Sequence, residues 1–187
     1  MYLVGTIGGI VVLAVLIIVW GISVYNRLIN RRTLKDEGWS GVDVQLKRRH
    51  DLIGNLVNTV KGYMQHERAV LEEVTRLRTS AQQANGVAAA AAAESGLNQA
   101  LGRLFAVMEN NPELKANTNV MHLQETLSSL EEQIQMARRY YNATVRDLNI
   151  VIQSFPSSII ARRYNFKESE FFELDNVAER AVPQVSF

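Results

Sequence analysis

Residues 3–22 read LVGTIGGIVVLAVLIIVWGI, and this stretch decides how the rest of the chain is organised. Thirteen of these positions are Leu, Ile or Val, and no charged residue occurs from Tyr2 to Tyr25. A helix of about 20 apolar residues spans the hydrocarbon core of a bilayer. Tyr2, Trp20 and Tyr25 lie near its ends, where aromatic side chains favour the membrane interface. The stretch therefore predicts a single transmembrane anchor over residues 1–25.

A cleaved signal peptide is the alternative for a hydrophobic N-terminal segment. Such a peptide combines a basic start, a shorter apolar core and small residues at the cleavage site. Here no Lys or Arg precedes the apolar run, and the residues that follow it include Trp20 and Tyr25. We therefore expect the helix to be retained as an anchor.

The residues that flank the anchor predict its orientation. Arg27, Arg31, Arg32 and Lys35 follow the span, whereas no basic side chain precedes it. The positive-inside rule then places the N-terminus outside and the rest of the chain in the cytoplasm. Gly5 and Gly9 form a small-xxx-small pair that can pack two anchors together, although glycine is also common in membrane helices without such a role.

Beyond the anchor, apolar residues recur at a spacing near 3.5 residues, which is typical of helices packed side by side. Arg49 and Glu67 interrupt the first of two such series. This pattern predicts an all-α protein, in which the anchor leads into an elongated antiparallel bundle of three to four helices with long first and last members. The first series is Val42, Leu46, Ile53, Leu56, Val60, Tyr63, Val70, Val74, Leu77 and Ala81, and the second is Val120, Leu123, Leu127, Leu130, Ile134, Ala137, Tyr141, Leu148, Ile152 and Phe155.

Helix boundaries follow from turn-forming residues. Residues 26–83 form either one helix or two, with a turn between Gly62 and Glu67 as the second possibility. Asn85-Gly86 and Asn110-Asn111-Pro112 predict helix ends. The run Ala88–Ala93 is expected to be helical without a buried face of its own. The remaining helices are expected over Leu97–Glu109 and Asn117–Ser154, with Asn117 or Thr118 as the cap of the last one.

Basic residues gather in two segments of the chain. Residues 26–49 carry seven basic and three acidic side chains, and residues 138–167 carry six and one. Antiparallel packing of the long helices would bring both segments to the membrane-proximal end, where they can contact an anionic lipid surface. The alternative is a solvated face with ion pairs within the helices. The expected membrane-surface contacts are Arg27, Arg31, Arg32, Lys35, Arg162, Arg163 and Lys167.

The sequence offers little for catalysis. It contains no cysteine, and none of His50, His66 and His122 has a second histidine three or four residues away. Neither a Gly-x-x-x-x-Gly-Lys phosphate loop nor a Gly-x-Ser-x-Gly nucleophile motif is present. We therefore predict no catalytic, cofactor-binding or metal site and no enzyme. A net charge of +1 also argues against a nucleic-acid partner, and no small-molecule substrate is expected.

Polar side chains on the two long helices are expected to pair across the bundle and fix its register rather than line a functional groove. The candidate pairs are Asp43 or Asp51 with Arg146, and Asp147 with Arg48. The C-terminal residues Val185, Ser186 and Phe187 follow Pro183 and are a candidate tail for docking to a partner, with a frayed end as the alternative.

Three blocks of residues resemble the LemA family. The first is Trp39–Arg49, continued by Asp51–Ile53, Asn55–Val57 and Thr59–Tyr63. The second is Pro112–Asn117 followed by Leu123-Gln124. The third joins Ala137-Arg138, Tyr141-Asn142, Val145–Asp147 and Asn149 to Phe155–Ser157. The likeness runs from about Tyr25 to Phe172, includes the position of the anchor, and extends to the Pro183–Phe187 ending. Gly54 departs from the family pattern, which often has proline before Asn55.

The resemblance implies a membrane-anchored antiparallel helical bundle, with a LemA-like domain over 26–172 between the anchor and an extended tail over 173–187. It implies no reaction, because the family has no well-established biochemical activity. Some relatives are associated with bacterial envelope or magnetosome membranes, which implies a bacterial source and a scaffold role. We therefore expect a single-pass protein of the inner membrane that binds protein partners or its own copies. A membrane-shaping or anionic-lipid-binding module is the alternative.

Overall fold

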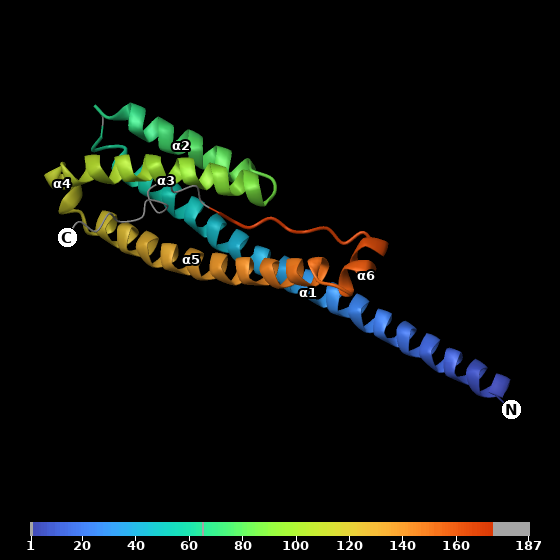
Figure 1. Ribbon diagram of the computed structural model, residues 1–187. Coiled ribbons are helices and arrows are strands. Elements are labelled where there is room, and N and C mark those ends of the chain that lie inside the picture. Colours follow the sequence, from blue (N-terminus) through green and yellow to red (C-terminus); the bar gives the residue numbers. More distant parts are fainter. Residues whose placement is uncertain (1, 65, 174–187) are drawn as a thin grey trace, which may run out of the picture.

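The computed structural model describes residues 2–64 and 66–173, with side chains from residue 7 onward. Every regular element in these ranges is a helix, which confirms the all-α prediction. Figure 1 shows one very long helix with the other helices gathered around its C-terminal half. The long helices are α1 (Tyr2–Val60), α2 (Arg68–Gln83), α3 (Val87–Glu109) and α5 (Thr118–Gln153), and the short ones are α4 (Pro112–Lys115) and α6 (Ser157–Arg163).

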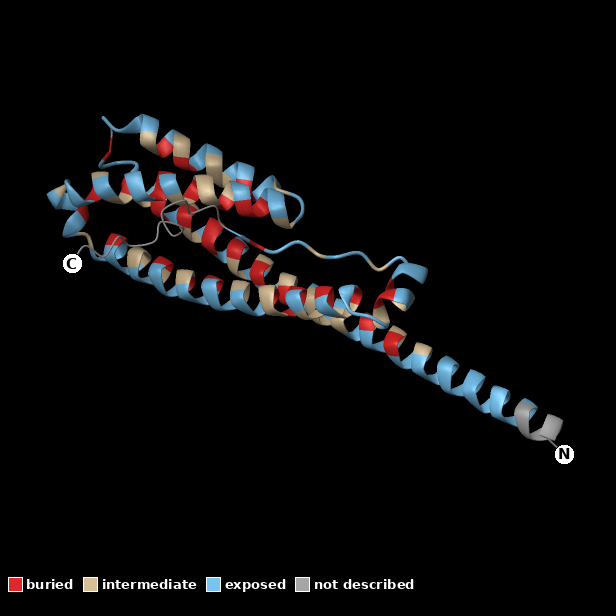
Figure 2. Ribbon diagram, in the orientation of Figure 1, coloured by how far each residue is buried: buried red, intermediate tan, exposed pale blue. Residues whose placement is uncertain are grey.

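Helix α1 is the axis of the molecule. Its 59 residues extend over roughly 88 Å at about 1.5 Å per residue. The N-terminal part stands clear of the bundle, and its large apolar side chains from Ile7 to Ile22 are all exposed, as Figure 2 shows. Burial begins at Val24 and Leu28, where other helices first pack against α1. One unbroken helix therefore carries both the apolar segment and the centre of the bundle.

Helix α5 packs antiparallel to α1, and the α2–α3 hairpin covers the distal half of the same helix (Figure 1). The predicted seams account for most of the core, since Val42, Ile53 and Leu56 of α1 are fully buried. Tyr63 and Phe155 are exceptions, at 44% and 83% exposure, because they lie in the turns after α1 and α5 have ended. Residues 26–83 thus form two helices rather than one, joined by a turn near Gly62 and Glu67.

Helix α3 begins ten residues earlier than the sequence suggested, at Val87 instead of Leu97. The expectation that the run Ala88–Ala93 has no buried face was wrong. Ala90 and Ala91 are buried in the same apolar cluster as Tyr141 and Phe172. The predicted cap of α5 is confirmed, since the Asn117 side chain accepts hydrogen bonds from the backbone N–H groups of Asn119 and Val120.

A close approach between α1 and α5 occurs at Gly38. A Cβ atom added there would lie 3.2 Å from the Tyr141 Cα and 3.2 Å from the Thr144 Oγ1, whereas one added at Gly41 would meet nothing within 4 Å. We expect Gly38→Ala to destabilise the protein by about 1–3 kcal/mol, because backbone must move to relieve the contact. Gly41→Ala is the matched control and should stabilise it by up to about 1 kcal/mol through helix propensity. Urea unfolding in mild detergent measures both, and equal effects of the two variants would contradict this account of the crossing.

Candidate functional site

The first candidate surface is the apolar part of α1. Among the described residues, this helix is long and apolar enough to cross a membrane, and 6% of its most apolar window is buried. A soluble protein would bury such a surface against other helices. Around Gly9 no other part of the protein lies within 4 Å of an added Cβ, so this position is open for packing. The surroundings of Gly5 lie outside the described side chains.

The second candidate surface is the basic end of the bundle. Helix α6 and the last turn of α5 pack against α1 just after the apolar segment, through Ile152 and Ala161 against Val24 and Leu28. The two basic segments are therefore neighbours, as antiparallel packing predicted. Five of the seven predicted contact residues are exposed, namely Arg27, Arg32, Arg162, Arg163 and Lys167. The other two are partly buried and already paired, Arg31 with Asp147 at 3.0 Å and Lys35 with Asp36 at 2.5 Å.

Aromatic rings pack against one another at this end of the bundle. The Tyr25 ring lies 4.8 Å from the Tyr164 ring and 5.9 Å from the Phe166 ring, measured between centroids. The guanidinium of Arg32 lies 5.4 Å from the centroid of Phe166. The sequence marked Tyr25 as an interface residue but gave no signal that Tyr164 and Phe166 would join it, because that contact depends on how the chain turns after α6.

The proposed ion pairs between the long helices were wrong. Asp147 pairs with Arg31 rather than Arg48, and Asp43 pairs with Lys47 on its own helix at 2.6 Å. In the observed packing, Asp147 of α5 lies opposite Arg31, near the start of the part of α1 that packs in the bundle. Arg48 lies several turns further along α1. Spacing along one helix does not fix this register.

An extended segment, residues 166–173, lies along the bundle after α6 (Figure 1). The Asn149 side chain donates to the Ser169 carbonyl at 2.9 Å and accepts from its N–H at 2.8 Å. Asn142 does the same with Phe172, at 3.2 and 2.9 Å. Seven helical residues rise about 10.5 Å, and three extended residues span about 10 Å. The two asparagines are therefore spaced to bind the segment in register.

Phe172 anchors the segment in the core. It is 1% exposed, and its ring lies 5.7 Å from Trp39 and 5.2 Å from the guanidinium of Arg138. The Tyr141 hydroxyl donates to the Glu170 carbonyl at 2.9 Å. Burial raises the pKa of Tyr141 to about 12, with smaller contributions from the carboxylates of Glu170 and Asp36. The hydroxyl therefore stays protonated, and able to donate this bond, until strongly alkaline pH.

We expect Asn149→Ala to loosen this segment without unfolding the bundle. The change removes two hydrogen bonds, which corresponds to about 1–3 kcal/mol of local opening free energy. Amide hydrogen exchange at Ser169 and Phe172 should then accelerate roughly 5- to 150-fold. Asn58→Ala, at an exposed position of α1, is the control and should leave these rates unchanged. Unchanged exchange at Ser169 in the Asn149 variant would show that packing alone holds the segment.

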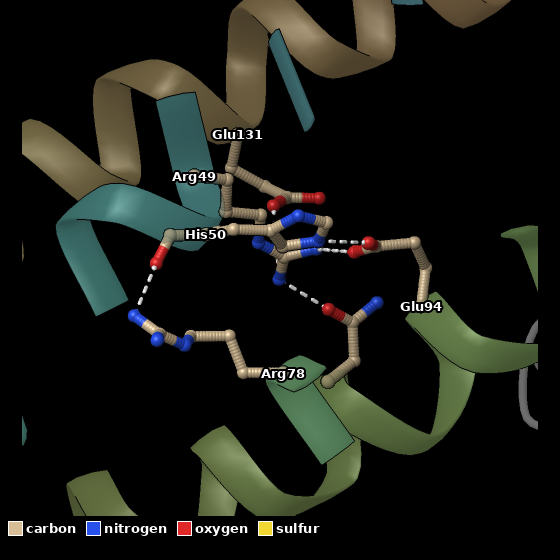
Figure 3. A network of polar contacts seen from close by, with 6 residues as sticks. Arg49, His50, Arg78, Glu94 and Glu131 are labelled. Atoms are coloured by element: carbon tan, nitrogen blue, oxygen red, sulfur yellow. Dashed lines mark hydrogen bonds and ion pairs between the residues drawn. The ribbon is translucent and has the colours of Figure 1, made fainter. Parts of the chain in front are cut away.

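The third candidate is a buried charged network between α1, α3 and α5 (Figure 3). Glu94 is 2% exposed and accepts from Arg49 at 2.8 Å and from His50 Nε2 at 2.6 Å. Arg49 also contacts the Asn98 side chain and pairs with Glu131 at 3.3 Å. These residues tie α3 to α1 and α5, because each helix contributes at least one charged partner.

Arg78 joins the network from α2 by donating to the His50 carbonyl at 3.2 Å. Its guanidinium occupies the space beside Gly54, where an added Cβ would overlap the Arg78 Nη1. Helix α1 is continuous through this position. Glycine at residue 54 therefore leaves room for α2 to bond the backbone of α1.

A groove of about 430 Å³ opens between α3 and α5, with Arg49 at its floor. Arg49 already donates to Glu94 and Asn98 and pairs with Glu131, so it offers little uncompensated charge to a ligand. Across the described ranges, no group of three or more His, Asp and Glu side chains is arranged to hold a metal ion. The geometry of the network suits fixing helix register better than chemistry.

Sequence reasoning missed this network, although one signal was present. Arg49 interrupts the apolar series at a seam position, and a charged residue at such a position must find partners when it is buried. Glu94 had no comparable signal, because it follows an alanine run that shows no amphipathic period. The predicted docking residues Val185, Ser186 and Phe187 lie outside the described residues.

The fold and its surfaces define a class: a membrane-associated helical protein, with one apolar N-terminal helix that continues into a bundle. The chain belongs to the LemA family, whose model matches residues 38–187. The curated relatives include Magnetosome protein MamQ 1 and Magnetosome protein MamQ 2 of Paramagnetospirillum magneticum. Each is 26% identical to this chain over an alignment 199 residues long, which covers 90% of this chain and 73% of the relative. Magnetosome protein MamQ of Magnetospirillum gryphiswaldense is 25% identical over 159 residues, covering 71% and 58%.

Proposed function

We propose that this protein is a non-catalytic, membrane-tethered interaction scaffold of the bacterial inner membrane. The observation that carries the proposal is the unbroken α1, whose exposed apolar half leads directly into the centre of the bundle. Because the helix does not break, the anchor and the bundle move as one rod, and the distal end is held away from the lipid. The basic flank after the anchor supports an outside N-terminus and a cytoplasmic bundle. The relatives named as magnetosome proteins support a role in a bacterial membrane.

We expect partners to bind the end of the bundle that lies away from the membrane. Crosslinking in intact membranes tests this, because the chain lacks cysteine and accepts single-cysteine probes without background. Cysteines at the exposed residues Glu72, Arg76 and Thr79 of α2 should give crosslinked species larger than the monomer. Probes at Leu13 and Ile17 report contacts of the anchor separately. Recovery of monomer alone from every α2 probe would count against a scaffold.

The basic end of the bundle supports a second candidate function, the binding of anionic lipids. Arg27, Arg162 and Arg163 are exposed, and the helices that carry them pack together at the end of the apolar segment. Each basic residue near an anionic surface contributes about 1 kcal/mol, and salt weakens this attraction. In reconstituted vesicles, energy transfer from Trp20 and Trp39 to dansyl-labelled phosphatidylglycerol should exceed transfer to labelled phosphatidylcholine. Reversing these three charges should abolish the difference, whereas reversing Lys61, Arg68 and Arg76 at the distal end should preserve it.

A further inference from the structure

The corner between α5 and α6, residues 154–164, exposes large apolar side chains. Phe155 is 83% exposed and Ile159 is 56% exposed, and Tyr164 of the same corner is 57% exposed. Single exposed apolar residues are normal on a protein surface, but apolar residues clustered beside a membrane span have a specific meaning. The position of the corner relative to α1 decides between these readings.

Contacts place the corner level with the end of the apolar segment. Ile152 of α5 packs in one cluster with Val24 and Leu28 of α1, and α5 runs toward the N-terminal end of α1. Phe155 follows three residues later in the chain, in the turn after α5 has ended. Beyond the turn, the Ile160 Cδ1 lies 3.7 Å from where a Cβ on Gly21 would be. The corner therefore packs against Gly21 as well as against the first buried residues of α1.

Gly21 belongs to the last turn of the predicted span. Residues 3–22 rise about 30 Å as a helix, which is the thickness of the hydrocarbon core. The headgroup regions add several ångströms on each side, since the whole bilayer is about 40–45 Å thick. A structure packed against Gly21 and Val24 must then lie in the headgroup region at that end of the span.

The chemistry of the corner matches this depth. Phe155 and Ile159 supply apolar surface, and Arg162 and Arg163 supply exposed cations one turn further along. The Tyr164 ring lies tilted against the Tyr25 ring at 4.8 Å between centroids, which places two tyrosines at the level where aromatic belts form. Apolar residues beside exposed arginines are typical of segments that lie in the interface with their apolar face toward the acyl chains.

We propose that the α5–α6 corner is a second membrane contact, in which Phe155 and Ile159 enter the headgroup–acyl boundary of the bilayer while Arg162 and Arg163 bind lipid phosphates. The inference rests on the proposed membrane anchoring of α1. Two points of attachment, the span and the corner, fix the tilt of the bundle on the membrane. The occupant of this apolar surface is the lipid bilayer, because the corner packs against Gly21 in the last turn of the apolar segment and carries the exposed arginines Arg162 and Arg163.

Site-directed spin labelling tests the proposal in the full chain. Single cysteines replace Phe155, Ile159, Leu16 and Met136, and each labelled protein is reconstituted into vesicles of phosphatidylcholine and phosphatidylglycerol. Met136 is the matched control, because it is an apolar residue of α5 with 55% exposure, close to that of Ile159, and lies far from the anchor. Accessibility to oxygen reports lipid, and accessibility to a water-soluble nickel complex reports water.

The expected result is high oxygen and low nickel accessibility at Phe155 and Ile159, as at Leu16, with the opposite at Met136. Nickel accessibility at Phe155 and Ile159 equal to that at Met136 would overturn the second contact, while a lipid-exposed Leu16 would leave the anchor intact. A water-exposed Leu16 would instead contradict the anchor itself. Protection of Phe155 and Ile159 from both reagents would overturn the proposal in favour of a second copy of the chain covering the corner.

Discussion

Introducing arginine at both Leu13 and Ile17 is expected to release the protein from membranes. Each change replaces a residue that favours insertion by about 0.3–0.6 kcal/mol with one that opposes it by about 2.5–3.5 kcal/mol near the helix centre. The pair therefore costs roughly 6–8 kcal/mol, which offsets the roughly 4–8 kcal/mol expected from the thirteen Leu, Ile and Val residues of the span. Resistance to alkaline carbonate extraction is the measurement.

Met136→Arg with Tyr140→Arg is the matched control for this change. Met136 and Tyr140 are also four residues apart, and they are 55% and 52% exposed, compared with 59% and 58% for Leu13 and Ile17. In the folded chain alone the two pairs should tolerate arginine equally well. A difference between them therefore reports lipid around α1, and full retention of the Leu13 and Ile17 variant in the membrane pellet would contradict the anchor.

Glu94→Ala is expected to destabilise the bundle by about 3–5 kcal/mol, because it leaves the Arg49 charge buried with weaker compensation. The Arg49 side chain is 9% exposed, so water cannot replace the missing carboxylate. Urea unfolding in mild detergent measures the change. Replacing both partners, as in Arg49→Met with Glu94→Leu, should recover much of the loss, since apolar residues of similar volume fill the space.

Glu73→Ala is the control for the buried pair. Glu73 pairs with Arg103 at 2.7 Å, a distance close to that between Glu94 and Arg49, but the two side chains are 37% and 54% exposed. Exposed ion pairs contribute about 0–1 kcal/mol. If Glu73→Ala and Glu94→Ala reduce the free energy of unfolding equally, burial does not make the Arg49–Glu94 pair more stabilising than an exposed pair. The proposal that the buried network fixes the register of the helices would then be wrong.

The arrangement of helices was largely predictable because it depends on local patterns. The spacing of Ile53, Leu56 and Val60 marked the buried face of α1, and Asn110-Asn111-Pro112 marked the end of α3 correctly. Asn117 was recognised as a cap because its side chain acts within its own turn. Such features need only the few residues that surround them, and sequence contains that information directly.

The contacts between distant segments were not predictable in the same way. Asp147 pairs with Arg31 across 116 residues, and the docking of Phe172 depends on where the chain turns after α6. Glu94 is buried against Arg49 and His50 of α1, and the alanine run before it has no periodic pattern that predicts this contact. Asn142 and Asn149 belong to the third block that resembles the LemA family, but their hydrogen bonds to backbone are seen only when the extended segment is in place.

Cysteine labelling along α1 in sealed membranes tests the central claim most directly. Single cysteines at Leu13, Ile17 and Asn30 are exposed to a membrane-impermeant maleimide added to both sides of the bilayer. Asn30 should react readily, and Leu13 and Ile17 should react only after denaturation in SDS, although all three are exposed in the structure. Reaction of Leu13 and Ile17 in intact membranes at the rate of Asn30 would show that water surrounds this helix, and the account would be wrong.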